Sequence, residues 1–220
     1  MKVRESLSRT NWADGGSCAN CASGLAGLGA PVDFWGEVGQ DALGEFVRRE
    51  LAARGVGVRD LLQDETVRTG ASAALSYPTG RALITYLGSI AALQTADLPL
   101  DWMGRYDYDH LHAGSIFIQH GLQAGLRELL RTAQAAWLST SLDCGWDPAD
   151  RWQFDWRVCL LYVNYFLPNK AEALRLTGAA TVEEAAAELS QSVHTLVVRQ
   201  GARGARLGGW RDRAGSRVSA

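Results

Sequence analysis

A pair of glycines near the start of the chain is followed, four residues on, by an asparagine. Gly15 and Gly16 let the backbone take positive φ angles and let a ligand approach without a Cβ in the way, and Asn20 both donates and accepts hydrogen bonds. Small residues and two leucines at helical spacing come next, which predicts a helix that ends near Gly29. We therefore expect Gly15, Gly16 and Asn20 to bind a small polyhydroxylated ligand at the start of that helix.

A second group, Asn169 and Glu172, lies where a predicted strand gives way to a helix. The free N–H groups and the dipole of a helix start favour phosphate, and a carboxylate on the same side can hold a water-bound Mg²⁺. The same spacing also suits a purely structural role, in which Asn169 caps the helix and Glu172 is an exposed first-turn residue. Both interpretations stay open on these two residues alone.

Two further features also follow predicted strands. Gly201 and Gly204 form a Gly-x-x-Gly turn, and Asp143 stands at the C-terminal end of the strand predicted at 136–142. Since ligands bind beyond the carboxyl ends of parallel strands, Asp143, Asn169 and Gly201 are expected to face one crevice. Asp143 also suits a merely structural Asx-turn.

The elements that must position these residues alternate between strands and helices. Such an order favours an α/β protein with a mostly parallel sheet and helices on both faces. The strands are predicted at 32–38, 66–77, 81–87, 110–119, 136–142, 163–167 and 195–199. The helices are predicted at 42–54, 122–135, 151–161 and 182–191, with one more that ends near 178, and 56–62 is predicted as a short connector.

The composition limits the classes of partner. The chain has 220 residues, of which 47% are hydrophobic, and this suits one domain with a core of adequate size. A net charge of −2 gives no electrostatic case for nucleic acid or for an anionic membrane surface. No apolar run approaches the ~20 residues of a membrane span, and residues 1–12 contain no apolar signal-peptide region. We therefore expect a cytoplasmic protein.

The cysteines and two histidines could in principle do chemistry of their own. Cys18 and Cys21 form a C-x-x-C, but Cys144 and Cys159 do not supply the second close pair of a zinc site. The favoured interpretation is that Cys18 and Cys21 are two small buried thiols. His110 and His112 lie on a predicted buried strand, where core or hydrogen-bonded histidines are favoured over proton shuttles or metal ligands.

Taken in order, the motifs resemble those of the ribokinase-like (pfkB-type) carbohydrate kinases. The N-terminal signature is the run from Gly15 to Gly44, which includes Gly-x-Val-Gly-x-Asp-x-x-Gly from Gly36 onward. The segment 165–178 is similar to the family's Asn-x-x-Glu segment. The segment 197–205 is similar to the strand and Gly-x-x-Gly turn by which the family holds ATP.

The resemblance implies a single three-layer α/β domain over residues 1–220, with a mostly parallel central sheet and a small β lid at about 64–90. From the residues alone, an ordinary hairpin in the main sheet suits that segment equally well. It implies phosphoryl transfer from ATP to a hydroxyl of a sugar or sugar acid, with ATP and Mg²⁺ as cofactors. Lid strands of the family often pair between subunits, so a homodimer is one expected assembly. The resemblance assigns the sugar to Gly15, Gly16 and Asn20, the nucleotide to Asn169, Gly201 and Gly204, and the metal, through water, to Glu172.

The sequence departs from the family pattern in three places. Arg199 stands where many members have Thr or another small polar residue, which puts a nucleotide contact there in doubt. The sugar-binding Asp upstream of the paired glycines and the Gly-Ala-Gly-Asp motif, which supplies the catalytic base, are not found, and Asp212 is the one late carboxylate. The resemblance covers about 15–205, so we expect a domain incomplete at both ends and a poor catalyst with an unknown base.

Two other functions remain to be weighed. The first is a non-catalytic module that binds nucleotide or sugar, or pairs with a partner chain. The second is a different α/β enzyme, such as a nucleotide-binding oxidoreductase. This second function is disfavoured because no predicted strand leads into a Gly-x-Gly-x-x-Gly.

Overall fold

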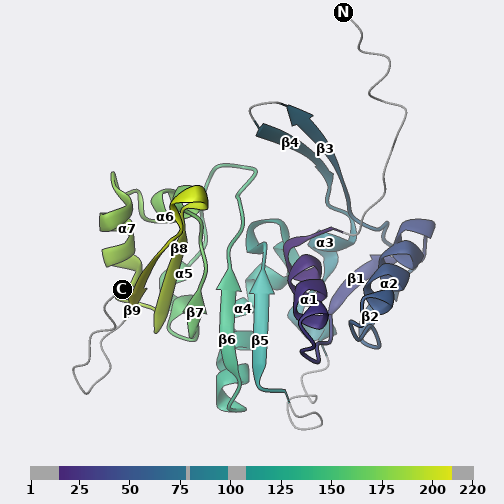
Figure 1. Ribbon diagram of the computed structural model, residues 1–220. Helices are drawn as coiled ribbons and strands as arrows, with labels where there is room; N and C mark the ends of the chain where they lie inside the picture. The colour runs from purple at the N-terminus through teal and green to yellow at the C-terminus, as the bar shows by residue number, and fades with distance from the viewer. Residues whose placement is uncertain (1–14, 78–79, 99–107, 210–220) are drawn as a thin grey trace, which may run out of the picture.

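The main sheet of the molecule places the ends of four parallel strands along one edge. The computed structural model describes residues 15–77, 80–98 and 108–209 (Figure 1). In the main sheet the strand order is β5-β6-β7-β8-β9. Its strands are β5 (His110–Gly114), β6 (Ser139–Asp143), β7 (Tyr165–Phe166), β8 (Thr195–Arg199) and β9 (Ala205–Gly209). The pairs from β5 to β8 are parallel, and β9 runs antiparallel to β8.

Two smaller sheets come from the first part of the chain. β1 (Gly36–Gly39) and β2 (Leu61–Asp64) are parallel, and β3 (Ala71–Tyr77) and β4 (Gly80–Tyr86) form an antiparallel hairpin. The hairpin projects from the rest of the molecule at the end where β5 and β6 finish (Figure 1). Its described side chains are almost all exposed, so it adds little to the core.

Helices pack around the sheets. α4 lies behind β5 and β6, and α1 lies toward the viewer beside β5 (Figure 1). The core contains buried residues of α4, of the strand β7 and of the C-terminal helices, such as Leu126, Phe166 and Leu189. The helices are α1 (Ser17–Gly27), α2 (Ala42–Ala53), α3 (Ser89–Ala92), α4 (His120–Ala135), α5 (Trp156–Leu160), α6 (Lys170–Thr177) and α7 (Val182–Leu189). Short 3-10 turns are η1 (Thr95–Asp97), η3 (Ile116–Ile118) and η4 (Gly201–Arg203).

The elements with strong local signals lie where the sequence predicts them. α2 begins after its N-cap Asp41, and Gly178 follows α6 with a φ of 73°. α4 buries its regularly spaced leucines, as an amphipathic pattern requires. The strand predicted at 195–199 is confirmed as β8, and the helix start after Gly16 is confirmed as α1.

Several predicted bounds are wrong. The strand predicted at 32–38 begins only at Gly36, and the connector predicted at 56–62 already contains the first residues of β2. The strand predicted at 110–119 ends at Gly114, because Ser115 takes a left-handed φ of 55° and turns the chain into η3. The helix predicted at 151–161 is only α5, since the preceding loop is organised by a buried carboxylate, Asp147.

Candidate functional site

The carboxyl ends of neighbouring strands bring Asp143, Glu172 and Arg199 together. Asp143 is the last residue of β6, Glu172 lies in the first turn of α6 after β7, and Arg199 is the last residue of β8. Arg199 Nη2 donates a hydrogen bond to Asp143 Oδ2 at 3.0 Å and lies 3.9 Å from Glu172 Oε2. Two carboxylates therefore face one guanidinium at the edge where the sequence predicts a ligand.

Asn169 and Glu172 form a complete capping box at the start of α6. Asn169 Oδ1 accepts from the Glu172 N–H at 3.0 Å, and Glu172 Oε2 accepts from the Asn169 N–H at 2.7 Å. Asn169 thus has the structural role that its spacing allowed. Glu172, however, is only 4% exposed, so it is not the exposed first-turn residue of that interpretation. Burial, together with the nearby Asp143 charge, raises the pKa of Glu172 despite the bond from Asn169.

Asp143 has a structural contact and a charged one. Its Oδ1 accepts from the Gly145 N–H at 3.2 Å, as an Asx-turn does, while its other oxygen takes the bond from Arg199. Ligand atoms of Asp143, Cys144 and Glu172 all lie within 4.8 Å of one another. Mg²⁺ is commonly held by one or two carboxylates and several waters, so the two carboxylates fit that ion.

The Gly-x-x-Gly turn lies next to this group. A parallel bridge joins Asn169 to Arg199, and the turn η4 begins two residues after Arg199. Gly201 and Gly204 have φ angles of 62° and 76°, and no other atom lies within 4 Å of the Cβ that either would carry. The backbone conformation therefore favours glycine, and the turn leaves its backbone open to an approaching ligand.

The paired glycines lie at the start of α1. Gly16 is the N-cap, with a φ of 101° and no side-chain cap, and Gly15, Gly16 and Asn20 are all exposed. Their backbone and side-chain groups are thus accessible to a ligand. The predicted sugar-binding residues are consequently on the surface, at an uncapped helix start.

A pair of serines, which the sequence did not reveal, joins α1 to the main sheet. Ser17 Oγ and Ser115 Oγ are 2.6 Å apart, and the Ser115 N–H donates to the carbonyl of Asp143 at 2.8 Å. At Gly114, an added Cβ would lie 2.9 Å from both Ser17 Oγ and Cys18 Sγ, so glycine permits the close approach of the helix. Through these contacts the start of α1 is held beside the end of β6.

The glycine signature around Gly39 and Gly44 is structural in its described contacts. Asp41 caps α2 through Gly44 N at 2.8 Å and accepts from Thr69 Oγ1 at 2.7 Å and from Thr69 N at 2.9 Å. Burial alone would raise the pKa of Asp41, but the bonds from Thr69 and Gly44 outweigh it and lower that pKa. At Gly44 an added Cβ would collide with the Gly39 carbonyl. The signature therefore fixes the base of the β3–β4 hairpin, which starts just after Thr69.

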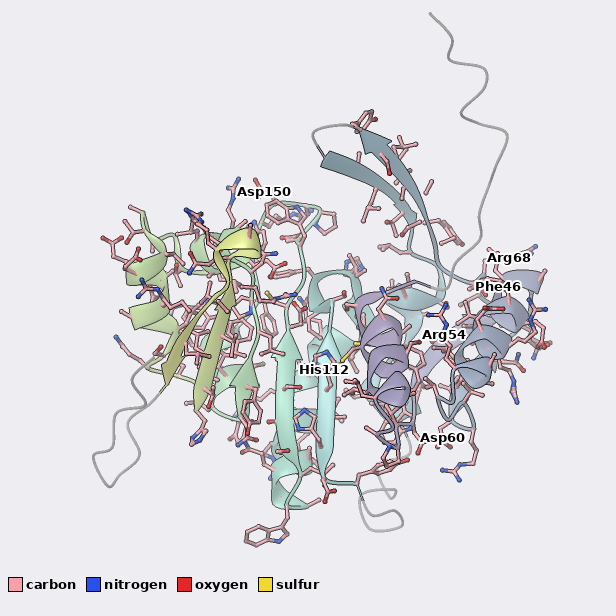
Figure 2. The ribbon with its side chains drawn as sticks, in the orientation of Figure 1. Phe46, Arg54, Asp60, Arg68, His112 and Asp150 are labelled. Carbon is pink, nitrogen blue, oxygen red and sulfur yellow. The ribbon has the colours of Figure 1, made fainter. Side chains whose placement is uncertain are left out.

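The histidines are hydrogen-bonded to serines, as expected. His110 contacts Ser139 Oγ and Ser141 Oγ, each at 2.7 Å, and His112 Nδ1 lies 2.7 Å from Ser141 Oγ. His112 lies on β5 beside α1 (Figure 2). Burial lowers the pKa of both imidazoles, which favours their neutral forms.

The cysteines are free thiols. Cys144 and Cys159 are buried, whereas Cys18 and Cys21 are only half-buried, so the expectation of two buried thiols is met in part. Burial raises the pKa of Cys18 to about 12.

Two surface hollows are lined by other residues. One, of about 460 Å³, is lined by residues around α6 that include Arg151, Trp152 and Arg175. The other, of about 700 Å³, is lined around β2 by residues that include Glu37, Asp64 and Asp97. Neither contains the residues that the sequence predicted to bind sugar or nucleotide.

Comparison with known proteins identifies the family. Residues 6–218 match the description "pfkB family carbohydrate kinase", a wider range than the 15–205 of the sequence motifs. The chain is 38% identical to fructokinase of Escherichia coli over 88 residues, which are 39% of this chain and 29% of the enzyme. It is 29% identical to 2-dehydro-3-deoxygluconokinase of Bacillus subtilis over 183 residues, or 76% of this chain and 55% of that enzyme. The chain thus spans about half or less of the length of these two relatives.

Solved structures show the same fold. A PfkB protein from Polaromonas sp. JS666 superposes with a TM-score of 0.77 at 25% identity, covering 93% of this chain and 72% of that one. A putative ribokinase II of E. coli, in complex with ATP and Mg²⁺, gives a TM-score of 0.77 at 20% identity, with 94% of this chain and 70% of that one covered. These matches confirm the ribokinase-like α/β fold with its mostly parallel sheet. In the described residues, no helix has the length and apolar content that crossing a membrane requires. By its match over nearly the whole chain, the protein belongs to the pfkB family of carbohydrate kinases.

Proposed function

We propose that this protein transfers the γ-phosphoryl group of ATP to a hydroxyl of a sugar or sugar acid, with Mg²⁺ as cofactor. The observation that carries the proposal is the convergence of Asp143, Glu172 and the η4 turn at one edge of the parallel sheet. The names of the relatives, a fructokinase and a 2-dehydro-3-deoxygluconokinase, support a sugar or a sugar acid as the acceptor.

The nucleotide phosphates are proposed to lie over the start of α6 and the η4 turn. Asn169 caps α6, and the N–H groups of a first helical turn attract anions. Gly201 and Gly204 leave their backbone open for close approach. Glu172, with Asp143 beside it, would hold Mg²⁺ through water, and the ion would supply positive charge to the phosphates.

The sugar is proposed to lie at the start of α1, against Gly15, Gly16 and Asn20. Support comes from their exposure and from the Ser17–Ser115 contact, which ties this helix start to the backbone of Asp143. The two proposed subsites are therefore joined through one residue, Ser115. The proposal assigns no catalytic base.

The β3–β4 hairpin is proposed as the lid, within the segment expected at about 64–90, and as the contact of a homodimer. A two-stranded hairpin is at best marginally stable alone, so a partner surface would stabilise it. Support comes from its large apolar side chains, which are exposed: Leu75, Tyr77, Leu83, Ile84 and Tyr86.

The experiment is ADP release by the purified chain with Mg²⁺ and ATP across a panel of ketoses, pentoses and sugar acids. We expect sugar-dependent release that falls on the order of 10–100-fold in Glu172→Gln. The matched control is Glu184→Gln, because Glu184 forms the same kind of capping box with Thr181 at the exposed start of α7. Nucleotide binding without turnover for any acceptor would favour the binding-module alternative. Absence of both binding and turnover would refute the proposal.

A further inference from the structure

We propose that Arg199 is a built-in cation that occupies the Asp143–Glu172 carboxylate pair in the nucleotide-free protein and competes with divalent metal for it. The inference rests on the proposed function in one respect, the assignment of Glu172 to the metal site. Beyond that assignment, Arg199 would control when the metal binds. Arg199 is also the position at which the sequence departs from the family's small polar residue.

The guanidinium is fixed by contacts on more than one side. Its Nε donates to the carbonyl of Leu167 at 3.0 Å, while Nη2 donates to Asp143 Oδ2 at 3.0 Å. The backbone is held as well, since the Arg199 N–H donates to the Pro168 carbonyl at 2.9 Å. The side chain is therefore directed across the sheet edge toward the carboxylates.

The two carboxylates need a positive neighbour. The side chains of Asp143 and Glu172 are 17% and 6% exposed, so water screens their mutual repulsion poorly. The other near neighbour is the buried Cys144 thiol, 3.9 Å from Glu172 Oε2, and it carries no positive charge. Arg199 supplies the positive charge at 3.0 Å and 3.9 Å. A divalent cation would serve the same carboxylates and would meet repulsion from the guanidinium.

The guanidinium can also leave. Its side chain is 49% exposed, against the buried carboxylate of Glu172, so it is the accessible partner of the pair. An anionic phosphate arriving at the neighbouring η4 turn would attract the guanidinium away from Asp143. Metal and nucleotide would then favour each other's binding, because the phosphate draws the guanidinium away from the carboxylates and the metal displaces the guanidinium toward the phosphate.

The test uses Mn²⁺ alone as the probe, titrated into the nucleotide-free protein and followed by electron paramagnetic resonance of free Mn²⁺. We expect the neutral variants Arg199→Gln and Arg199→Thr to bind Mn²⁺ about tenfold more tightly than wild type, because only part of the Coulomb repulsion survives at a half-exposed site. Arg199→Lys keeps the charge and should stay near wild type. Arg175→Gln is the matched control, because Arg175 is similarly exposed and pairs with Asp150 at 3.4 Å.

Adding Glu172→Gln to the neutral variant tests whether the tighter Mn²⁺ binding occurs at the Asp143–Glu172 pair. This second substitution should abolish the increase in Mn²⁺ affinity. Circular dichroism and thermal unfolding show which of the neutral variants Arg199→Gln and Arg199→Thr folds, and one folded variant is enough for the test. The proposal is overturned if a folded neutral variant binds Mn²⁺ no more tightly than wild type, or if the gain survives loss of the Glu172 charge. Because no nucleotide or sugar is present, this result is independent of whether the protein turns over ATP.

Discussion

Glu172 has a structural contact in the capping box and a proposed functional role, and two substitutions separate them. Glu172→Gln keeps an oxygen that can accept from the Asn169 N–H, which lies 2.7 Å from Oε2 in the wild type. The lost charge is one that folding already disfavours, because burial raises the pKa of this carboxyl. We therefore expect Glu172→Gln to change the free energy of unfolding by less than about 1 kcal/mol.

Glu172→Ala removes the acceptor as well as the charge. The Asn169 N–H loses its partner, which costs about 1–3 kcal/mol, and the one buried methylene that disappears costs about 0.8 kcal/mol. The total expected loss of stability is about 2–4 kcal/mol. The two substitutions thus differ sharply in unfolding, measured by urea denaturation, whereas both remove the negative charge near the proposed metal.

The functional assay is Mg²⁺-dependent ATP binding and ADP release. Both variants are expected to lose on the order of 10–100-fold, the range seen when a residue that supports a metal site is removed. The reasoning fails if Glu172→Gln binds Mg²⁺ and ATP as wild type does, because Glu172 would then be a helix cap alone.

The same carboxyl gives a pH dependence with a definite sign. A raised pKa means that the folded state holds the proton more tightly than the unfolded state, so stability falls as pH rises from about the ordinary value of 4.5 through the folded pKa. Glu172→Gln should remove that fall. Unfolding measured across this pH range would contradict the assignment if wild type and variant kept parallel curves.

Three further predictions follow from described contacts. Asp41→Asn turns an amide NH₂ toward the Thr69 N–H and should lower the free energy of unfolding by about 1–2 kcal/mol at pH 7. Because the pKa of Asp41 is lowered, the stability difference between wild type and variant should disappear as pH falls below about 3.8, as measured by urea denaturation, and an unchanged difference at low pH would exclude this cause. Gly88 has a φ of 45°, and the Cβ of an alanine there would collide with the Arg68 carbonyl. Gly88→Ala should therefore displace the base of the hairpin and speed proteolysis between β3 and β4, and equal cleavage rates in wild type and variant would contradict this prediction. Cys18, with a pKa of about 12 against 9.0, should be alkylated at pH 8 on the order of 1000-fold more slowly than in the denatured chain, and peptide mapping that found similar rates would show that the pKa of this thiol is not raised.

Local signals in the sequence predicted much of the fold, because they act over a few residues. Asp41 and Asn169 are side-chain caps, Gly178 ends a helix with a positive φ, and the leucines of α4 repeat at helical spacing. The strands β2 and β9 escaped prediction for the opposite reason. β9 contains Ala-Arg-Leu-Gly-Gly, whose composition does not favour a strand, and it forms because β8 offers an edge for antiparallel pairing.

The candidate site also combines residues that the sequence could place with contacts that it could not. The positions of Asn169, Glu172 and Gly201 after predicted strands follow from the order of elements, so the sequence could indicate one edge. The partners of Arg199 could not be read in that way. Asp143 is 56 residues away from it, and Ser17 is 98 residues away from Ser115, so these contacts depend on how the strands are ordered in the sheet.

The capping contact and the proposed metal role of Glu172 need not exclude one another, because the carboxylate has two oxygens. The contacts described for it, from the Asn169 N–H, the Cys144 thiol and the Arg199 guanidinium, all reach Oε2. A metal bound directly to Oε2 would have to displace the cap, which would loosen the start of α6. A metal held through water by Oε1 would leave the cap in place and still feel the full carboxylate charge. The geometry therefore favours a metal on the Oε1 side, where a helix cap orients the same carboxylate that would serve the metal.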